Sequence, residues 1–163
     1  MRPEGALSGG NQNNYFGLDV YGTSNELFIG KPGAGAMTNY VLEDRGGSNQ
    51  VASGASVVLD QTALLVVKAE FNAYPTPDVF TLYANPSTLG VEPASGVVKT
   101  MSDIGAVNQL VIYSTGAFGI DEIREGMTYA DVTPVPEPSV LTLFCIAAIS
   151  WLGFAWRWRT KAS

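Results

Sequence analysis

Residues 140–156 constrain this chain more than any other stretch, because they form seventeen consecutive residues without a charge. The run reads VLTLFCIAAISWLGFAW, and only Thr142 and Ser150 interrupt its apolar surface. As an α-helix it would span about 25 Å, near the lower limit for crossing a hydrocarbon core of about 30 Å. A buried helix of a soluble domain, the alternative, normally carries a polar stripe, so the pattern favours a single C-terminal transmembrane helix.

The charges on either side of this run predict its orientation. Residues 157–163 form a short tail with three cations, Arg157, Arg159 and Lys161, and no anion. Cytoplasmic flanks of membrane helices are enriched in Lys and Arg, which predicts a cytoplasmic C-terminus. The part before residue 140 holds all fifteen acidic residues against six Lys or Arg, a net charge of −9. This acidic part is expected on the outer side of the membrane, and its charge argues against nucleic acid or anionic membrane surfaces as partners.

The predicted linker, residues 133–139, contains the sequence Pro136-Glu137-Pro138 directly before the apolar run. Each proline fixes φ near −65°, so the prolines stop the helix from extending outward and hold Glu137 in an extended segment. A stiff spacer next to the membrane is the simpler interpretation. A recognition element is the alternative that the neighbouring segments favour.

The order of this motif, a short apolar helix and an Arg-rich terminus resembles the PEP-CTERM sorting signal of exopolysaccharide-producing Gram-negative bacteria. The resemblance covers about the last 29 residues and implies export, followed by recognition of the tail by an exosortase, a membrane-embedded transpeptidase. The precursor would reside in the inner membrane, and the processed protein at the cell surface or in the extracellular matrix. The motif does not define the cleavage position. A permanent tail anchor without an exosortase is the alternative.

The N-terminus fits this expectation poorly. Residues 1–14 are polar and rich in Gly and Asn, so they are predicted to be disordered, and they contain no apolar core of a signal peptide. A sorting tail requires an export signal. The expectation is therefore that the sequence is N-terminally shortened, for example by a misplaced start codon.

Residues 15–132 are predicted to form one all-β domain. Eighteen Gly and nine Pro punctuate short runs that are rich in β-branched and aromatic residues. The predicted strands are 15–21, 26–29, 39–43, 56–59, 63–71, 78–85, 108–113, 120–125 and 128–132. The runs 63–71 and 78–85 are predicted to pair as a hairpin, and 88–100 to form a loop. Because each strand needs an opposing sheet to cover its apolar face, a β-sandwich is the predicted architecture.

Five phrases, LLVVKAEF, DVFTLYANP, QLVIY, GIDEIREG and TYADV, occur in the order found in the second half of a concanavalin A-like jelly roll, the laminin-G, lectin and glucanase superfold. The resemblance covers roughly Phe28 to Val132 and depends on strand order, not on a catalytic signature. It implies a jelly-roll-type β-sandwich that is incomplete here, because such folds usually need more strands.

Catalytic signals are weak. The chain has no histidine, which excludes Ser-His-Asp and Cys-His catalysis and His-ligated metals within it. The single cysteine, Cys145, lies in the predicted membrane helix. The acidic segment 121–125 does not match the Glu-x-Asp-x-x-Glu pattern of glucanases, since Ile123 separates Asp121 from Glu125, and a solvated terminal strand is the preferred interpretation. No catalytic residue is assigned.

Binding signals are also limited. Calcium is common in this superfold, yet the acidic residues that could ligate it form no loop motif, so no metal or other cofactor is assigned. These residues are Asp19, Asp44, Asp60, Asp103 and Asp131. Several aromatic residues could line a sugar-stacking groove, although core positions are the simpler interpretation. They are Tyr15, Tyr21, Tyr40, Phe80 and Tyr83.

The sequence therefore predicts a non-catalytic surface or matrix protein whose β domain binds extracellular polysaccharide. The alternative is a remnant of a carbohydrate-active enzyme whose active residues precede Met1.

Overall fold

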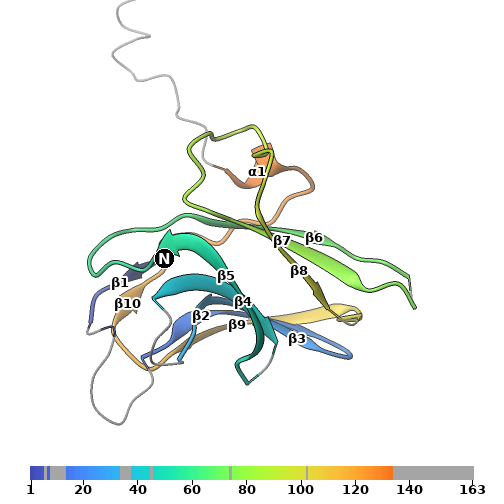
Figure 1. Cartoon of the computed structure of the whole chain (residues 1–163), viewed down its shortest axis with the longest axis horizontal. Coiled ribbons are helices and arrows are strands. Elements are labelled where there is room, and N and C mark those ends of the chain that lie inside the picture. Colours follow the sequence, from blue (N-terminus) through green and yellow to red (C-terminus); the bar gives the residue numbers. More distant parts are fainter. Residues whose placement is uncertain are drawn as a thin grey trace, which may run out of the picture. The chain divides into compact units, whose positions relative to one another are not determined.

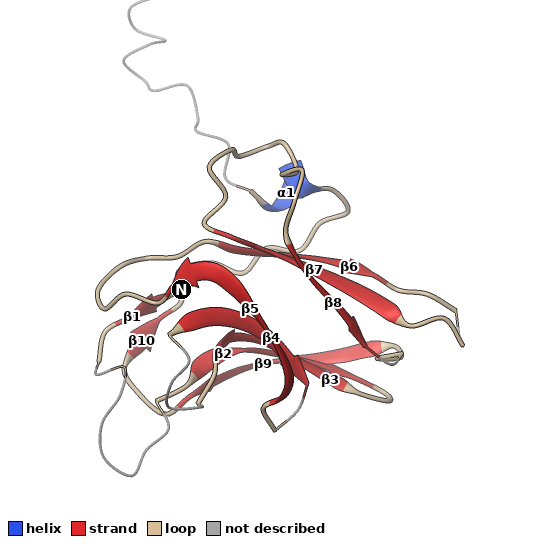
Figure 2. Cartoon of the chain, viewed as in Figure 1, coloured by secondary structure: helices blue, strands red, loops and turns tan. Residues whose placement is uncertain are grey.

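Antiparallel β-strands make up nearly all the regular structure of the described residues (Figures 1 and 2). The computed structural model describes residues 1–5, 7, 14–33, 38–44, 46–73, 75–101 and 103–133. The described residues confirm the predicted all-β class, and they contain a single four-residue helix. Within these ranges no helix is both long enough and apolar enough to cross a membrane. The Pro136-Glu137-Pro138 motif, the apolar run 140–156 and the basic tail lie outside the described residues.

The larger sheet has five antiparallel strands in the order β5-β4-β3-β2-β9. The strands are β2 (Phe16–Gly22), β3 (Glu26–Lys31), β4 (Asn39–Asp44), β5 (Ser48–Ser56) and β9 (Val107–Ser114). Four of them overlap runs in which apolar side chains predicted strands. The exception is β5, whose sequence is polar and small.

The smaller sheet has three antiparallel strands, β6 (Leu65–Glu70), β7 (Asp78–Ala84) and β8 (Val97–Met101), in the order β6-β7-β8. The predicted hairpin is confirmed, because β6 and β7 pair in an unbroken register from Leu65 opposite Ala84 to Glu70 opposite Val79.

One apolar cluster joins the two sheets. Every second residue of a strand points to the same face, so the larger and smaller sheets each contribute an alternating set of side chains. These side chains meet between the sheets and exclude water, which stabilises both sheets together. The buried members are Leu27, Ile29, Leu42, Phe80, Leu82, Met101 and Ile104.

A second apolar cluster lies beside the N-terminus, with Met1 packed against it. Its buried members are Phe16, Tyr40, Val57 and Ala63. β1 (Arg2–Pro3) pairs with β10 (Phe118–Gly119), and the Met1 ammonium group donates to the Ala63 carbonyl at 2.7 Å. Burial lowers the pKa of this ammonium group, while Asp121 raises it. The predicted disorder of residues 1–14 is therefore wrong for residues 1–5, because backbone pairing with distant segments outweighs their polar composition. Residues 8–13 lie outside the described residues.

Two boundaries differ from the prediction because strand pairing outweighs local composition. The predicted strand 56–59 is wrong beyond Ser56, since β5 occupies the preceding nine residues and hydrogen-bonds along β4. The predicted loop 88–100 contains most of β8, which pairs with β7 from Val97 opposite Leu82 to Met101 opposite Asp78.

The last two predicted strands are also wrong. Residues 120–125 have no strand structure, and Ile123 is exposed. Residues 128–132 form the N-cap and helix α1 (Tyr129–Val132). The Asp131 amide donates to the Thr128 hydroxyl at 3.3 Å, and the Thr128 amide donates to the Asp131 carboxylate at 2.9 Å. This reciprocal capping box favours a helix start over a strand.

Candidate functional site

A groove lies on the face of the five-stranded sheet that points away from the core. Leu27 and Leu42 belong to the core cluster, so their neighbours Glu26, Phe28 and Glu43 point to the opposite face. The groove has a volume of about 530 Å³ and receives side chains from all five strands. Its lining residues are Tyr15, Asp19, Tyr21, Glu26, Phe28, Gly33, Glu43, Gly46, Gly47, Gln50 and Tyr113.

Three carboxylates from three different strands line this groove. Strand register places Phe28 on β3 between Asp19 on β2 and Glu43 on β4, and it places Glu26 opposite Tyr21. The exposed fractions are only 6% for Asp19, 8% for Glu26 and 7% for Glu43. Carboxylates are seldom buried this deeply, so the groove concentrates negative charge in a place where solvent screens it poorly.

Burial opposes the ionisation of the Glu43 carboxyl group. Burial raises its pKa, while a hydrogen bond from Gln50 and the positive charge of Lys99 lower it in part, and the net direction is upward. The Gln50 side-chain amide donates to Glu43 Oε2 at 2.5 Å, which fixes that carboxylate toward β5. Glu43 is thus held in place and is ionised at the expense of desolvation.

Lys99 lies near Glu43, but its ammonium group contacts Asp44 and Asn49. Its ammonium group lies 2.9 Å from Asp44 Oδ1 and donates to the Asn49 carbonyl at 2.7 Å. Burial pushes the pKa of Asp44 up, but hydrogen bonds from Asn49 and Lys99 outweigh burial and hold this pKa below its usual value. Lys99 therefore neutralises Asp44 first and compensates Glu43 only in part.

Aromatic rings form one end of the groove. The ring centroids of Tyr15 and Tyr113 lie 6.4 Å apart at an interplanar angle of 33°. Two hydrogen bonds hold Tyr15 there, from its amide to the Thr115 hydroxyl at 3.1 Å and from the Thr115 amide to its carbonyl at 3.0 Å. The two rings thus form a pre-positioned apolar surface beside the carboxylates.

Tyr21 connects the aromatic end to the acidic end. A hydrogen bond with Tyr113 raises the pKa of Tyr21 to about 12, with burial and the charges of Glu26 and Asp19 adding to the effect. The phenol therefore stays protonated at every physiological pH. It remains a hydroxyl group that can both donate and accept hydrogen bonds at the centre of the groove.

Gly17 keeps the floor of the groove open for the Phe28 ring. A Cβ atom on Gly17 would lie 2.6 Å from Phe28 Cζ and would also collide with the Ile29 carbonyl. A side chain at this position would displace the ring that separates Asp19 from Glu43.

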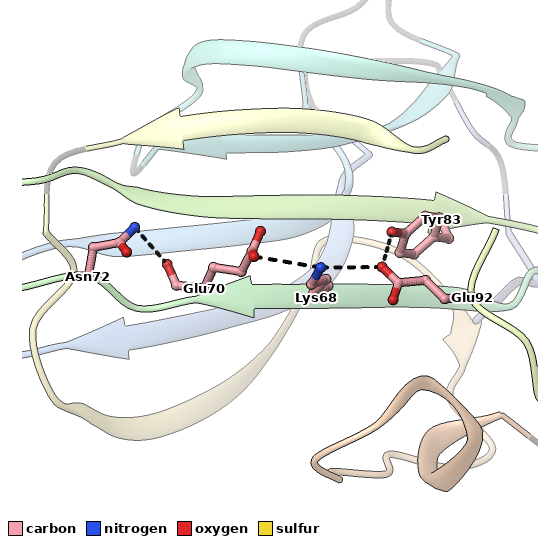
Figure 3. Close-up of polar contacts among 5 residues, drawn as sticks. All are labelled: Lys68, Glu70, Asn72, Tyr83 and Glu92. Atoms are coloured by element: carbon pink, nitrogen blue, oxygen red, sulfur yellow. Dashed lines mark hydrogen bonds and ion pairs between the residues drawn. The ribbon is translucent and has the colours of Figure 1, made fainter. Parts of the chain in front are cut away.

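A second cavity, of about 790 Å³, is lined by residues 53–55 of β5, residues 82–84 of β7 and residues from the 86–97 segment. Its charged lining residue, Glu92, belongs to a network of polar side chains (Figure 3). Lys68 lies 3.6 Å from Glu70 and 3.4 Å from Glu92, and the Tyr83 hydroxyl donates to Glu92 at 2.6 Å. Burial and this hydrogen bond raise the pKa of Tyr83 to about 12. The network attaches the 86–97 segment to the sheet, which is a structural role.

The acidic residues considered for calcium do not gather. Among the described residues no three acidic, histidine or cysteine side chains lie close enough together to hold a metal ion. Asp60 pairs with Arg2 at 3.6 Å, Asp103 accepts from the Gly105 amide at 2.6 Å, and Asp131 caps α1. Asp44 pairs with Lys99, and only Asp19 lies in the groove.

The aromatic residues considered for sugar stacking divide into two groups. Tyr40 and Phe80 are core residues, each 1% exposed, as the simpler interpretation predicted. Tyr15 and Tyr21 line the groove, and Tyr83 lines the second cavity.

The acidic segment 121–125 is exposed and lies outside the groove. Its Glu122 and Arg124 pair with each other at 2.8 Å. The two charges therefore neutralise each other.

Sequence reasoning missed Glu26, Glu43, Gln50 and Tyr113 as groove residues. The available signal for the two glutamates was an acidic residue directly beside an apolar strand residue, as in the phrases ELF and LED. Comparison of the chain with protein-family models, with curated proteins and with solved structures gives no match. The site is therefore defined by its geometry alone.

Proposed function

We propose that the chain is an exported surface or matrix protein whose β unit binds neutral polysaccharide in the groove. The observation that carries this proposal is the combination of buried acceptors, Asp19, Glu26 and Glu43, with the Tyr15 and Tyr113 rings in a single cavity. Sugar rings offer hydroxyl donors at their edges and C–H groups on their faces. The hydroxyl groups can donate to carboxylate and amide oxygens, and the C–H faces can stack on aromatic rings.

The charge of the groove selects among polysaccharides. Three carboxylates line it, Lys99 is engaged by Asp44, and the chain before residue 140 carries a net charge of −9. A uronate or phosphate polymer would bring further negative charge into a poorly screened site. The ligand class that fits is an uncharged polysaccharide.

The finer fold assignment belongs to the same proposal. Two stacked antiparallel sheets, with a groove across the larger one, support a jelly-roll-type β-sandwich of the concanavalin A-like kind. The tail, with Pro136-Glu137-Pro138, the apolar run and Arg157, Arg159 and Lys161, supports exosortase sorting through the inner membrane to the cell surface. The interpretation as a permanent tail anchor is the competing outcome.

Binding is tested with the full chain in a mild detergent and a panel of neutral glucan, mannan and galactan pentasaccharides, by isothermal titration calorimetry. At least one neutral sugar should bind, and pentagalacturonate should not. Tyr113→Ala should weaken binding about 3- to 10-fold, the range for loss of one aromatic contact. Phe71→Ala, which removes an aromatic ring that is 57% exposed directly after β6, is the matched control. Equal loss in both variants, or binding of pentagalacturonate alone, would refute the proposal.

Sorting is tested by expressing the full-length gene in its host and identifying the C-terminal residue of the mature protein by mass spectrometry. The mature chain should lack Trp151 to Ser163, and Glu137→Ala should accumulate the uncleaved precursor. Glu125→Ala, which alters an exposed glutamate outside the motif, should mature normally. An intact terminus in the mature unmodified protein would favour the permanent anchor.

A second candidate function is glycoside hydrolysis, favoured by one observation. Burial raises the pKa of Glu43, and a general acid needs a raised pKa of this kind, while Asp19 lies one strand beyond Phe28 on the same face. Reducing ends released from the bound neutral polysaccharide, and lost in Glu43→Gln, would favour this candidate. Binding without release would favour the non-catalytic function.

A further inference from the structure

The two sheets have four edge strands, and three of them carry features that oppose pairing with another chain. β6 carries the charged side chains Lys68 and Glu70, and β8 has only five residues and includes Lys99. The pairing of β5 with β4 contains two register shifts. Charges, short length and bulges are the usual means by which edge strands avoid association.

β9 is different. It has eight residues, VNQLVIYS, with no charge and no proline, and it pairs with β2 without a break from Gln109 to Ser114. In the described part of the chain no strand pairs with its other edge. Leu110 and Ile112 on one face are 48% and 53% exposed, and Tyr113 on the other is 40% exposed. An exposed, regular and apolar edge of this length is a template for a further strand.

We propose that β9 is a self-association edge, on which a second copy of this chain adds its own β9 in antiparallel orientation. A second copy can approach this edge because the strand itself carries no charge. The part of the chain before residue 140 carries a net charge of −9, so two copies repel each other except where they meet along an uncharged strip. The edge is also self-complementary, because an antiparallel pair of identical strands closes with twofold symmetry.

The register follows from two requirements, that both copies present the same face and that the apolar residues 110–112 lie at the centre of the pair. Val111 then lies opposite Val111 of the partner subunit, and Leu110 lies opposite Ile112 of the partner subunit. Opposite side chains in an antiparallel pair are about 4.5–5.5 Å apart at Cβ, close enough for the exposed aliphatic groups to contact. The joined sheet would have ten strands, twice the five of one copy.

This assembly has a consequence for the groove. Tyr113 lies on β9, so the groove reaches the edge that the second copy would extend. The two grooves would lie on one continuous face and end beside each other. A long polysaccharide could then bind both at once, which raises its affinity through effective concentration.

Disulfide trapping tests the register in the full chain. In a Cys145→Ser background, which removes the only native thiol, Val111→Cys should form a covalent dimer on mild oxidation in detergent. Val98→Cys is the control, because Val98 is 53% exposed on the edge strand β8. A trapped dimer at position 111 and none at position 98 supports the proposal. No dimer at position 111, or equal trapping at both positions, overturns it.

The mass of the protein in detergent, measured by light scattering with the detergent contribution subtracted, tests association without a cross-link. The unmodified chain should have twice the monomer mass, and Ile112→Lys should halve it. Val98→Lys introduces the same charge at a site of equal exposure and should leave the dimer intact. Far-ultraviolet circular dichroism verifies that both variants are folded. A monomeric unmodified chain would overturn the proposal.

Discussion

The outer faces of the two sheets use the same residue types in opposite ways. On the three-stranded sheet, Glu92 accepts from Tyr83 and pairs with Lys68, and its pKa is lowered mainly by the Tyr83 hydrogen bond. On the five-stranded sheet, Glu43 is more deeply buried and its pKa is raised by desolvation. The first face balances its own charges, and the second keeps negative charge beside an open groove.

This difference bears on which of the two faces can gain from a ligand. A paired network such as that of Lys68 stabilises the fold and leaves little for a ligand to gain. A partly compensated buried carboxylate such as Glu43 reduces stability, and a ligand that donates hydrogen bonds would relieve the cost. The cavity that adjoins Glu92 is the larger of the two, at about 790 Å³ against 530 Å³, so size alone does not identify the site.

The largest expected effect on the free energy of unfolding comes from disrupting the core that the two sheets share. Phe80 is 1% exposed within the cluster between the sheets, so Phe80→Ala should lower the free energy of unfolding by about 3–5 kcal/mol. Urea denaturation followed by far-ultraviolet circular dichroism is the appropriate measurement, since all three tryptophans lie at 151–158. Phe71→Ala should cost no more than about 1.5 kcal/mol, the value of its edge contact with Phe80. Equal losses would mean that the sheets do not share this core.

A smaller effect is expected from filling the floor of the groove. Gly17→Ala should destabilise the chain by about 1–3 kcal/mol, because the new methyl group would displace the Phe28 ring. It should also weaken sugar binding in the calorimetric assay. Gly54→Ala on β5 is the control, since a Cβ atom there meets nothing within 4 Å. If Gly17→Ala behaves like Gly54→Ala, Phe28 does not determine the shape of the groove.

The smallest expected effects are changes in the free energy of unfolding that have opposite signs on the two faces. The pKa of Glu43 is raised on folding, so its ionisation costs stability once the pH exceeds the unfolded value, near 4.5. Glu43→Gln should therefore raise the free energy of unfolding at pH 7, and this gain should disappear below pH 4.5. A loss of stability at pH 7 would mean that Glu43 is as well compensated as Glu92.

Glu92 should show the opposite behaviour. Its pKa is lowered on folding, so its stabilising contribution is present above pH 4.5 and is lost as the pH falls through the lowered value. Glu92→Gln should reduce the free energy of unfolding at pH 7 and have no effect in acid. Denaturation curves of both variants between pH 3 and pH 7 provide the measurement.

Much of the sheet architecture could be predicted from local patterns. Alternating or continuous apolar residues identify β2, β3, β4, β6, β7 and β9, and all of these except β9 pack side chains into the core. Local sequence patterns did not predict β5 and β8, and the reason is physical. Ser48–Ser56 has few apolar side chains, and Val97–Met101 follows a stretch rich in Gly and Pro, so their pairing partners determine their conformation.

The groove was harder to predict than the strands. Asp19, Glu26 and Glu43 come together only through the registers of β2 with β3 and of β3 with β4. No local spacing encodes these registers. Tyr113 is added by β9, which joins the sheet beside β2 although it lies far along the chain. The sequence did reveal Tyr15, Tyr21 and Asp19, but not what they surround.

The most direct test of the central claim is to locate the ligand on one face or the other. Amide chemical shifts of the ¹⁵N-labelled full chain in detergent would be followed during titration with the mixed neutral pentasaccharides. We predict shifts at Asp19, Phe28, Glu43 and Tyr113, with none at Lys68, Tyr83 or Glu92. Shifts confined to Lys68, Tyr83 and Glu92, or no shifts at all, would contradict the assignment of the groove as the binding site.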